Sequence, residues 1–213
     1  LKLEGRWEMT RRIGLATTIA AVAILTQGLL ALAPAAAQAN SVSVSVTGGN
    51  TLQVVGDDTD NTIHESRETD PACPGGSPCD AVWSEGTVLT PSAPCIESDL
   101  QPGTGSYRAL CPASGITGLV EFGHGGDDQF YGDLGLPADI HGGPGKDAIT
   151  GGSANDTLVG GAGNDKLIGG PGNDVLKGKA GNDGMDGRGG HDRCIGGAGR
   201  DTPRHCERVK SVP

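Results

Sequence analysis

From Gly142 onward the sequence repeats with a period of nine residues. Written in rows it reads GGPGKDAIT, GGSANDTLV, GGAGNDKLI, GGPGNDVLK, GKAGNDGMD, GRGGHDRCI and GGAGRDTPR. Glycine opens every row and aspartate fills the sixth position of every row. A fixed short period is typical of a solenoid, in which each repeat adds one unit to a stack. The sequence therefore predicts a repeat architecture.

The repeat extends toward the N-terminus in a weaker form. Residues 123–131 read GHGGDDQFY, with Asp128 in the aspartate position and Phe130 in the apolar position. A ten-residue unit, 132–141, connects this row to the regular ones. We therefore expect the array to begin near Gly123.

Each row is interpreted as a turn of about six residues followed by a strand of about three. Glycines permit the positive φ angles of tight turns. Because side chains alternate between the two faces of a strand, each short strand points one residue inward. The apolar residues predicted to face inward are Ile149, Leu158, Leu167, Leu176 and Met185. These patterns predict an all-β fold.

The repeated aspartates predict a site for a divalent cation. Stacked strands lie about 4.7 to 4.9 Å apart, so the carboxylates would form columns at that spacing. Neighbouring carboxylates repel by about 1 kcal/mol in water and about 3 to 4 kcal/mol at an effective dielectric constant near 20. A hard cation removes this repulsion, and carboxylate and carbonyl oxygens are the ligands that Ca²⁺ prefers. The chain's formal net charge of −10 also suits a cation and argues against nucleic acid and anionic membranes as partners.

These rows resemble the GGxGxDxUx nonapeptide of RTX, or haemolysin-type, calcium-binding repeats. The resemblance implies a parallel β-roll, a form of β-solenoid, in which two rows make one coil and calcium ions lie between turns two rows apart. It implies one column of Asp147, Asp165, Asp183 and Asp201, a second column of Asp156, Asp174 and Asp192, and about five ions. The implied metal ligands are these aspartates with Asp128, together with turn residues at the first, second and fourth row positions: Gly142, Gly143, Gly145, Gly151, Gly152, Gly160, Gly161, Gly163, Gly169, Gly170, Gly172, Gly178 and Gly181.

Some rows depart from this pattern. Lys179 and Arg188 replace the second glycine, Ala154 replaces the fourth-position glycine, and Gly184 weakens one strand. We expect calcium occupancy to fall toward the C-terminus. Pro203 occupies an apolar strand position, and because proline cannot donate to a strand ladder, the roll is predicted to end there. The roll is thus expected over 123–204, with 205–213 as a C-terminal cap.

Residues 1–39 are interpreted as an upstream extension followed by a secretory signal peptide. Arg11 and Arg12 precede an uncharged run, 13–33, and Ala37-Gln38-Ala39 fits a cleavage site. A retained membrane anchor is the alternative, because about 20 apolar residues can span a bilayer. Cleavage would make the protein extracellular.

An even number of cysteines in an exported chain predicts disulfides. The six cysteines allow 15 pairings, which sequence cannot distinguish. Pairing of nearest neighbours is our prediction: Cys73 with Cys79, Cys95 with Cys111, and Cys194 with Cys206. No CxxC or HxxxH spacing supports zinc, and a free thiol is the remaining alternative.

The segment 40–122 is predicted to be disulfide-stapled β structure without a large core of its own. Alternating Val42, Val44 and Val46, a glycine-rich turn, and a second apolar run predict a hairpin. Residues 56–63 resemble one degenerate repeat, with Asn61 in the aspartate position and Ile63 in the apolar position. Further strands are expected at 81–83, 87–89 and 117–122.

No catalytic motif is present, since the chain lacks HExxH and GxSxG. His64 lies near Glu65 and Glu68, which we interpret as polar residues at an exposed strand end. His124, His141 and His191 are interpreted as turn residues. A hydrolase or toxin therefore has no supporting constellation, and we expect no enzyme activity.

The leading hypothesis is a secreted calcium-binding protein in which calcium drives folding outside the cell. The alternative is an extracellular adhesion or interaction protein that uses the calcium-rigidified roll as a spacer and the cysteine-rich segment as its contact face. A protein or cell-surface partner is compatible with both hypotheses, and the sequence does not identify one.

Overall fold

The computed structural model describes residues 41–48, 50–69, 72–73, 78–85, 88–97, 106–132 and 134–210. The predicted signal peptide lies outside these residues. Residues 38–213 form one compact unit. Every regular element in the described ranges is a strand, so none of them contains a helix that could cross a membrane.

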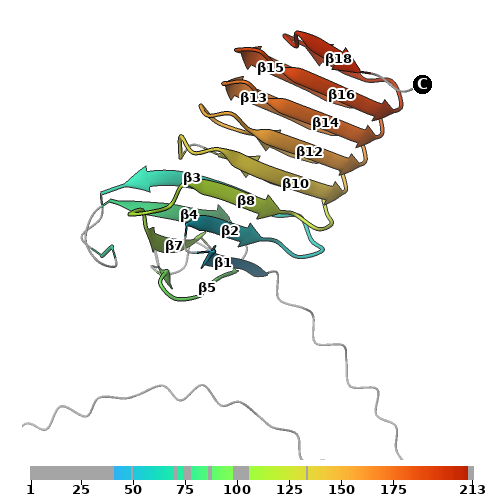
Figure 1. Cartoon of the computed structure of the whole chain (residues 1–213). Coiled ribbons are helices and arrows are strands. Elements are labelled where there is room, and N and C mark those ends of the chain that lie inside the picture. The colour runs from blue at the N-terminus through green and yellow to red at the C-terminus, as the bar shows by residue number, and fades with distance from the viewer. Residues whose placement is uncertain are drawn as a thin grey trace, which may run out of the picture. The chain divides into compact units, whose positions relative to one another are not determined.

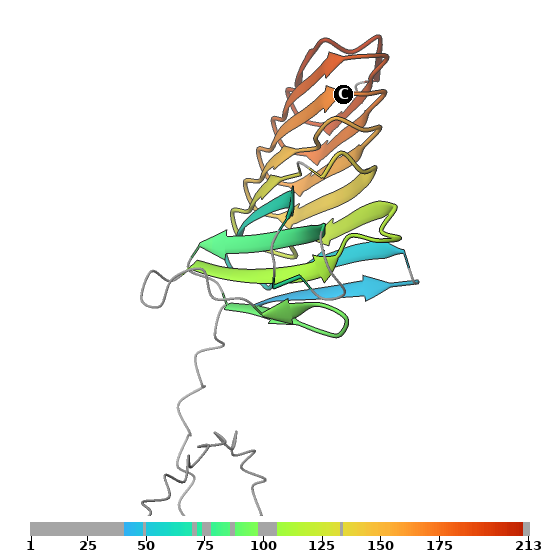
Figure 2. The same cartoon turned by 90° about the vertical axis from the view of Figure 1, so that its left-hand side faces the viewer.

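Within these residues, eighteen strands form two nine-stranded sheets that face each other (Figure 1). The first sheet has the order β18-β16-β14-β12-β10-β8-β2-β1-β5, and we call it sheet A. The second has the order β17-β15-β13-β11-β9-β3-β4-β7-β6, and we call it sheet B. The view in Figure 2 shows the chain passing from one sheet to the other as the coils stack. The predicted all-β solenoid is confirmed.

In the repeat region, successive strands alternate between the sheets and pair in parallel. Residues paired between neighbouring coils are 18 positions apart, as in Leu158 with Leu176, so one coil contains two rows. The offset is 19 between β8 and β10 and between β9 and β11, because the ten-residue unit adds one position. The strands are β8 (Gly118–Phe122), β9 (Gln129–Tyr131), β10 (Ala138–Pro144), β11 (Ala148–Thr150), β12 (Thr157–Ala162), β13 (Lys166–Pro171), β14 (Val175–Ala180), β15 (Gly184–Gly189), β16 (Arg193–Ala198), β17 (Thr202–Arg204) and β18 (Arg208–Lys210).

Strands β12 to β16 contain six residues each, not the three predicted. The ladder continues past the apolar position into the next row, where Gly143 pairs with Gly161 and Pro144 with Ala162. Only three residues then remain for each turn between these strands. The glycines at the start of a row thus belong to strands as well as to bends.

The roll also continues beyond Pro203, so the prediction that it ends there is wrong. Pro203 lies in β17 and pairs with Met185 of β15, and β18 pairs with β16. Proline is tolerated because β17 is the edge strand of sheet B, where no further strand needs its missing N–H.

The N-terminal strands extend the same two sheets. The predicted hairpin is confirmed, since β1 and β2 pair antiparallel. Parallel pairing of β2 with β8, and of β3 with β9, joins this segment to the roll. The prediction missed β6 and β7 and included residue 87, which lies outside the described residues. The strands are β1 (Ser41–Thr47), β2 (Thr51–Val55), β3 (Thr62–Glu68), β4 (Cys79–Glu85), β5 (Val88–Pro91), β6 (Ile96–Glu97) and β7 (Ser106–Pro112).

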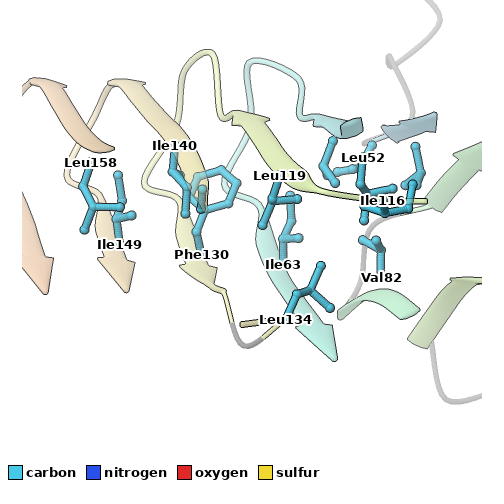
Figure 3. Close-up of a cluster of buried hydrophobic side chains, with 14 of the residues drawn as sticks. Leu52, Ile63, Val82, Ile116, Leu119, Phe130, Leu134, Ile140, Ile149 and Leu158 are labelled. Carbon is cyan, nitrogen blue, oxygen red and sulfur yellow. The ribbon is translucent and has the colours of Figure 1, made fainter. Parts of the chain in front are cut away.

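One apolar core runs between the sheets from Val42 to Cys194. Figure 3 shows part of it as a file of side chains, including Ile140, Ile149 and Leu158, that point inward from both sheets. The five repeat residues predicted to face inward are all at most 1% exposed. Burying each such side chain contributes about 1.5 to 3 kcal/mol, so each coil adds its own share of stability.

All three predicted disulfides are present: Cys73–Cys79, Cys95–Cys111 and Cys194–Cys206. Cys194 occupies an inward position in β16, one coil beyond Leu176. Its bridge to Cys206 closes the core at the C-terminal end, where no further coil packs against it.

Candidate metal site

The repeat aspartates form two columns along the roll. In the first column, the backbone N–H of Asp147 donates to Oδ1 of Asp165 at 2.9 Å, and that of Asp165 donates to Oδ1 of Asp183 at 3.0 Å. In the second column, the N–H of Asp156 donates to Asp174 at 2.8 Å and that of Asp174 to Asp192 at 2.9 Å. Each carboxylate therefore ties its coil to the preceding coil.

Both columns have distinct first and last members. Asp128 precedes Asp147 in the first column, and Asn61 precedes Asp128. Asn61 thus occupies the aspartate position predicted for the degenerate repeat 56–63. Asp201 ends this column.

The second column begins with Asp156, whose carboxylate accepts the backbone N–H of Ala138. It ends with Glu207, whose carboxylate accepts the N–H of Asp192. Glu207 was not predicted from the sequence, because the last coil is shorter and breaks the nine-residue period.

The second carboxylate oxygen of each column aspartate is buried and lacks a hydrogen-bond partner. These are the Oδ2 atoms of Asp128, Asp147, Asp156, Asp165, Asp174, Asp183, Asp192 and Asp201. Leaving buried anionic oxygens unpaired is costly, so such atoms call for a cation or a proton.

The first glycine of each row borders these oxygens. A Cβ placed on Gly169 would lie 2.3 Å from Oδ2 of Asp174 and 2.9 Å from the carbonyl oxygen of Gly187 in the next coil. The corresponding distances at Gly178 are 2.2 Å to Asp183 Oδ2 and 2.8 Å to the Gly196 oxygen. The absent Cβ therefore leaves a cradle lined by a carboxylate oxygen and a carbonyl oxygen, which is the chemistry that Ca²⁺ prefers.

Fourth-position glycines lie close to carbonyl oxygens of the preceding coil. Gly163 has φ +144°, and a Cβ there would lie 1.7 Å from the carbonyl oxygen of Gly145. Lys179 and Arg188 adopt positive φ angles of 87° and 73° at second positions, as glycines do elsewhere in the roll. The two substitutions thus keep the turn geometry at a cost of about 1 to 3 kcal/mol each in backbone strain.

The environment of the columns raises the carboxyl pKa values. Burial, which disfavours the charged form, raises the pKa of Asp128, Asp147, Asp156, Asp165 and Asp174 to about 6. The hydrogen bond to Oδ1 opposes this shift, while neighbouring acidic side chains add to it. Burial also raises the pKa of Asp183.

The side chains alone do not surround a metal ion. No group of three or more His, Cys, Asp or Glu side chains is positioned to bind one metal within the part of the chain that the structure describes. At Gly169 and Gly178 the nearest oxygens come from a carboxylate and from a backbone carbonyl. A cation there would depend on carbonyl ligands from two coils, which fits the chemistry of calcium better than that of zinc.

A second ladder runs along the exposed turns at the fifth row position. The N–H of Asn173 donates to Oδ1 of Asn155 at 2.8 Å, and that of Asn182 donates to Asn164 at 2.8 Å. In this ladder the N–H of each coil donates to a side chain of the preceding coil, whereas in the aspartate ladder it donates to a side chain of the following coil. Its sequence signal is asparagine at the fifth position of four consecutive rows, a pattern from which no ladder was predicted.

His64 and the neighbouring glutamates do not form the exposed strand end that was expected from the sequence. The ring of His64 stacks between Trp83 and Tyr131, with centroids 4.5 and 4.6 Å away. Glu65 is only 3% exposed, and Glu68 accepts a hydrogen bond from Arg108. Likewise, His141 lies in β10 and stacks on Phe122, so its interpretation as a turn residue is wrong.

Comparison with known proteins agrees with the repeat geometry. The family model of the RTX calcium-binding nonapeptide repeat (4 copies) matches residues 141–176 and 168–203. No curated protein and no solved structure is significantly similar to the chain. The matched rows are the ones that build the two aspartate columns. Residues 141–203 therefore contain RTX-type nonapeptide repeats, and these rows build the β-roll.

Proposed function

We propose that this chain is an extracellular calcium-binding protein whose two aspartate columns bind Ca²⁺ between stacked turns, and that this binding drives folding of the roll. The observation that carries the proposal is the set of eight buried, unpartnered Oδ2 atoms in two columns. The repeats belong to a calcium-binding kind, and their oxygen-lined cradles fit that cation.

The ligands in this proposal are the column aspartates and the carbonyl oxygens at the first, second and fourth row positions. The cradles at Gly169 and Gly178 support the first-position carbonyls directly. Pairs of neighbouring aspartates among the seven regular rows number three in one column and two in the other, which gives about five ions. Bound calcium supplies positive charge between the coils.

Electrostatic repulsion makes folding dependent on the cation. Two carboxylates about 4.8 Å apart repel by about 3 to 4 kcal/mol at an effective dielectric constant near 20, and each added coil repeats this cost. Affinities of about 10⁻⁴ to 10⁻³ M, typical of extracellular modules, would suffice where calcium is plentiful. The chain would then fold after export.

An extracellular location is supported by the cysteines. All six form disulfides in the structure, which is typical of an oxidising compartment. The predicted signal peptide, 1–39, agrees with this location.

Calorimetric titration with calcium tests the site assignment. We expect Asp165→Asn to reduce the number of bound ions by one or two, because Asp165 has a column neighbour on each side. The amide keeps an oxygen that can accept the N–H of Asp147, so the coil-to-coil hydrogen bond survives while the charge is lost.

The matched control is Asp139→Asn, which removes an exposed carboxylate of β10 outside the columns. This variant should bind calcium as the unmodified chain does. Equal binding by the unmodified chain and Asp165→Asn would contradict the assignment of the aspartate columns as calcium ligands.

A further inference from the structure

The C-terminal coils carry a positive net charge, although the chain as a whole is acidic. The chain as a whole carries a formal net charge of −10, yet nine of its 16 Lys and Arg residues lie within 166–210. The column aspartates of these coils, up to Asp192, are at most 2% exposed, so their carboxylates do not form the surface. The outer surface near the C-terminus is therefore basic.

The cations gather on the outer face of sheet A. Strand pairing places Arg193 directly beside Arg208, and Lys177 in line with Ile195 and Lys210. Lys179 follows two residues after Lys177 on β14. We call these five residues the basic face: Lys177, Lys179, Arg193, Arg208 and Lys210. Figure 1 shows β14, β16 and β18 as consecutive strands at the C-terminal end of the sheet.

The charges of the basic face are not neutralised within the described residues. None of the five side chains forms an ion pair there, whereas Arg67, Arg108 and Arg188 do. The other outward positions on these strands include Val175 and Ile195, and none is acidic. Glu207, next in sequence to Arg208, directs its carboxylate to the N–H of Asp192.

The shape of this face suits an extended ligand. Adjacent strands lie about 4.8 Å apart and alternate residues along a strand about 6.7 Å apart, so the cations spread over roughly 10 by 13 Å. Lys177, Lys179, Ile195, Gly196 and Gly197 line a shallow hollow. Arg193 and Arg208 border a second hollow at the start of the strands, whose lining also includes Asp174, Asp192 and Glu207. A linear chain with regularly spaced anionic groups matches this array.

We propose that the basic face binds a linear anionic glycan of the extracellular space. Its sulfate, phosphate or carboxylate groups would pair with the five cations. A single-stranded nucleic acid fits less well, because the outward residues of these three strands include no aromatic side chain on which bases could stack. A flat sheet face also does not enter the major groove of a duplex, which admits a helix or a two-stranded ribbon.

Binding to immobilised heparin, a linear sulfated glycan, tests the proposal at constant calcium and about 0.05 to 0.15 M salt. The full chain should bind heparin and not uncharged dextran, with affinity falling as salt rises. The variant Lys177→Gln/Arg193→Gln/Lys210→Gln should bind at least about tenfold more weakly, since each cation near an anionic surface contributes substantially.

The matched control is Lys146→Gln/Lys166→Gln/Arg204→Gln. These exposed residues lie on or beside sheet B, so the variant has the same net charge as the test variant but keeps the basic face. The control should retain heparin binding within about threefold. Circular dichroism in calcium should show that both variants keep the β-roll.

Three outcomes would overturn the proposal. The first is no heparin binding by the full chain. The second is equal weakening by the two variants, because net charge rather than the basic face would then control binding. The third is tighter binding to single-stranded DNA or to vesicles containing phosphatidylserine than to heparin, which would assign the face to another class of partner.

Discussion

At the scale of single residues, the recurring positions of aspartate and glycine within each row have two separate causes. The aspartate carboxylate uses Oδ1 to bind the preceding coil and leaves Oδ2 facing the first glycine of its own row. The fourth glycine adopts a positive φ angle and approaches a carbonyl of the preceding coil. A side chain at either glycine would push neighbouring coils apart.

Gly163→Ala should therefore destabilise the roll strongly. Its Cβ would stand 1.7 Å from the Gly145 oxygen, and φ is +144°. We expect a loss of about 3 kcal/mol or more in unfolding free energy, measured by urea denaturation in calcium. Gly189→Ala is the control, because a Cβ there meets nothing within 4 Å. Its effect should remain within about 0.5 kcal/mol. Equal effects of the two substitutions would show that coil contact does not require the glycine.

Two buried glutamates make stability depend on pH. Glu65 in β3 and Glu121 in β8 face each other across the core, and their carboxyl oxygens lack other partners. Burial raises the pKa of Glu121 to about 7, and burial together with the neighbouring Glu121 raises the pKa of Glu65. Near them, Val54, Ile140 and Val82 are apolar strand neighbours.

Since the folded-state pKa of Glu121 exceeds its unfolded value, the protonated pair is favoured in the fold. The resulting stability is complete below about pH 4.5 and is lost as pH rises through about 7, by on the order of 3 kcal/mol. Glu121→Gln should weaken this dependence between pH 5 and 8.5, measured by chemical denaturation in saturating calcium, and the part due to burial of Glu65 should remain. An unchanged pH profile would contradict the role of the pair.

At the scale of elements, the roll needs a closed end. The outermost strands, β17 and β18, have no further coil to cover them, and Val209 is 53% exposed. Charged Arg208 and Lys210 on the edge oppose pairing with another chain. The Cys194–Cys206 bridge holds the last turn over the core.

Replacing both Cys194 and Cys206 by serine should loosen the C-terminal coil first. We expect a loss of about 2 to 4 kcal/mol and faster hydrogen exchange confined to β16, β17 and β18. The double replacement of Cys73 and Cys79 is the control, since it lies in a small separate cluster with Ala81 and Leu110. Faster exchange in β16 to β18 of that control would argue against a local cap.

Much of the element order was predictable because the repeat imposes one geometry on every row. The nine-residue period predicted the columns, the core residues and even the degenerate row at Asn61. It did not predict β18, because the last coil is three residues shorter and places glutamate where aspartate is expected. The full six-residue length of the strands was missed because a glycine pair can be extended or bent. Only its hydrogen bonding to the neighbouring strand determines which conformation it adopts.

The N-terminal segment was harder to predict, since only the degenerate row 56–63 resembles the repeat there. Glu65 and Glu121 occupy inward positions that alternation alone would assign to apolar residues. Strand β7 lacked the β-branched residues that mark a strand, and it is positioned by antiparallel pairing with β4. The stack of Trp83, His64 and Tyr131 depends on three strands that are distant in sequence.

At the scale of the whole molecule, the two ends of the solenoid differ. Two disulfides and mixed strand pairing hold the N-terminal coils, whereas the C-terminal coils depend on repeated rows, on their aspartate columns and on one terminal disulfide. Calcium dependence is therefore expected mainly in the roll. The N-terminal segment provides a folded end on which successive coils can stack.

Far-UV circular dichroism during calcium titration tests this central claim most directly. The full chain should gain β signal as calcium rises into the range of about 10⁻⁴ to 10⁻³ M, lose it on addition of chelator, and respond much less to magnesium. Full β signal already present in chelator, and unchanged by calcium, would contradict calcium-driven folding of the roll.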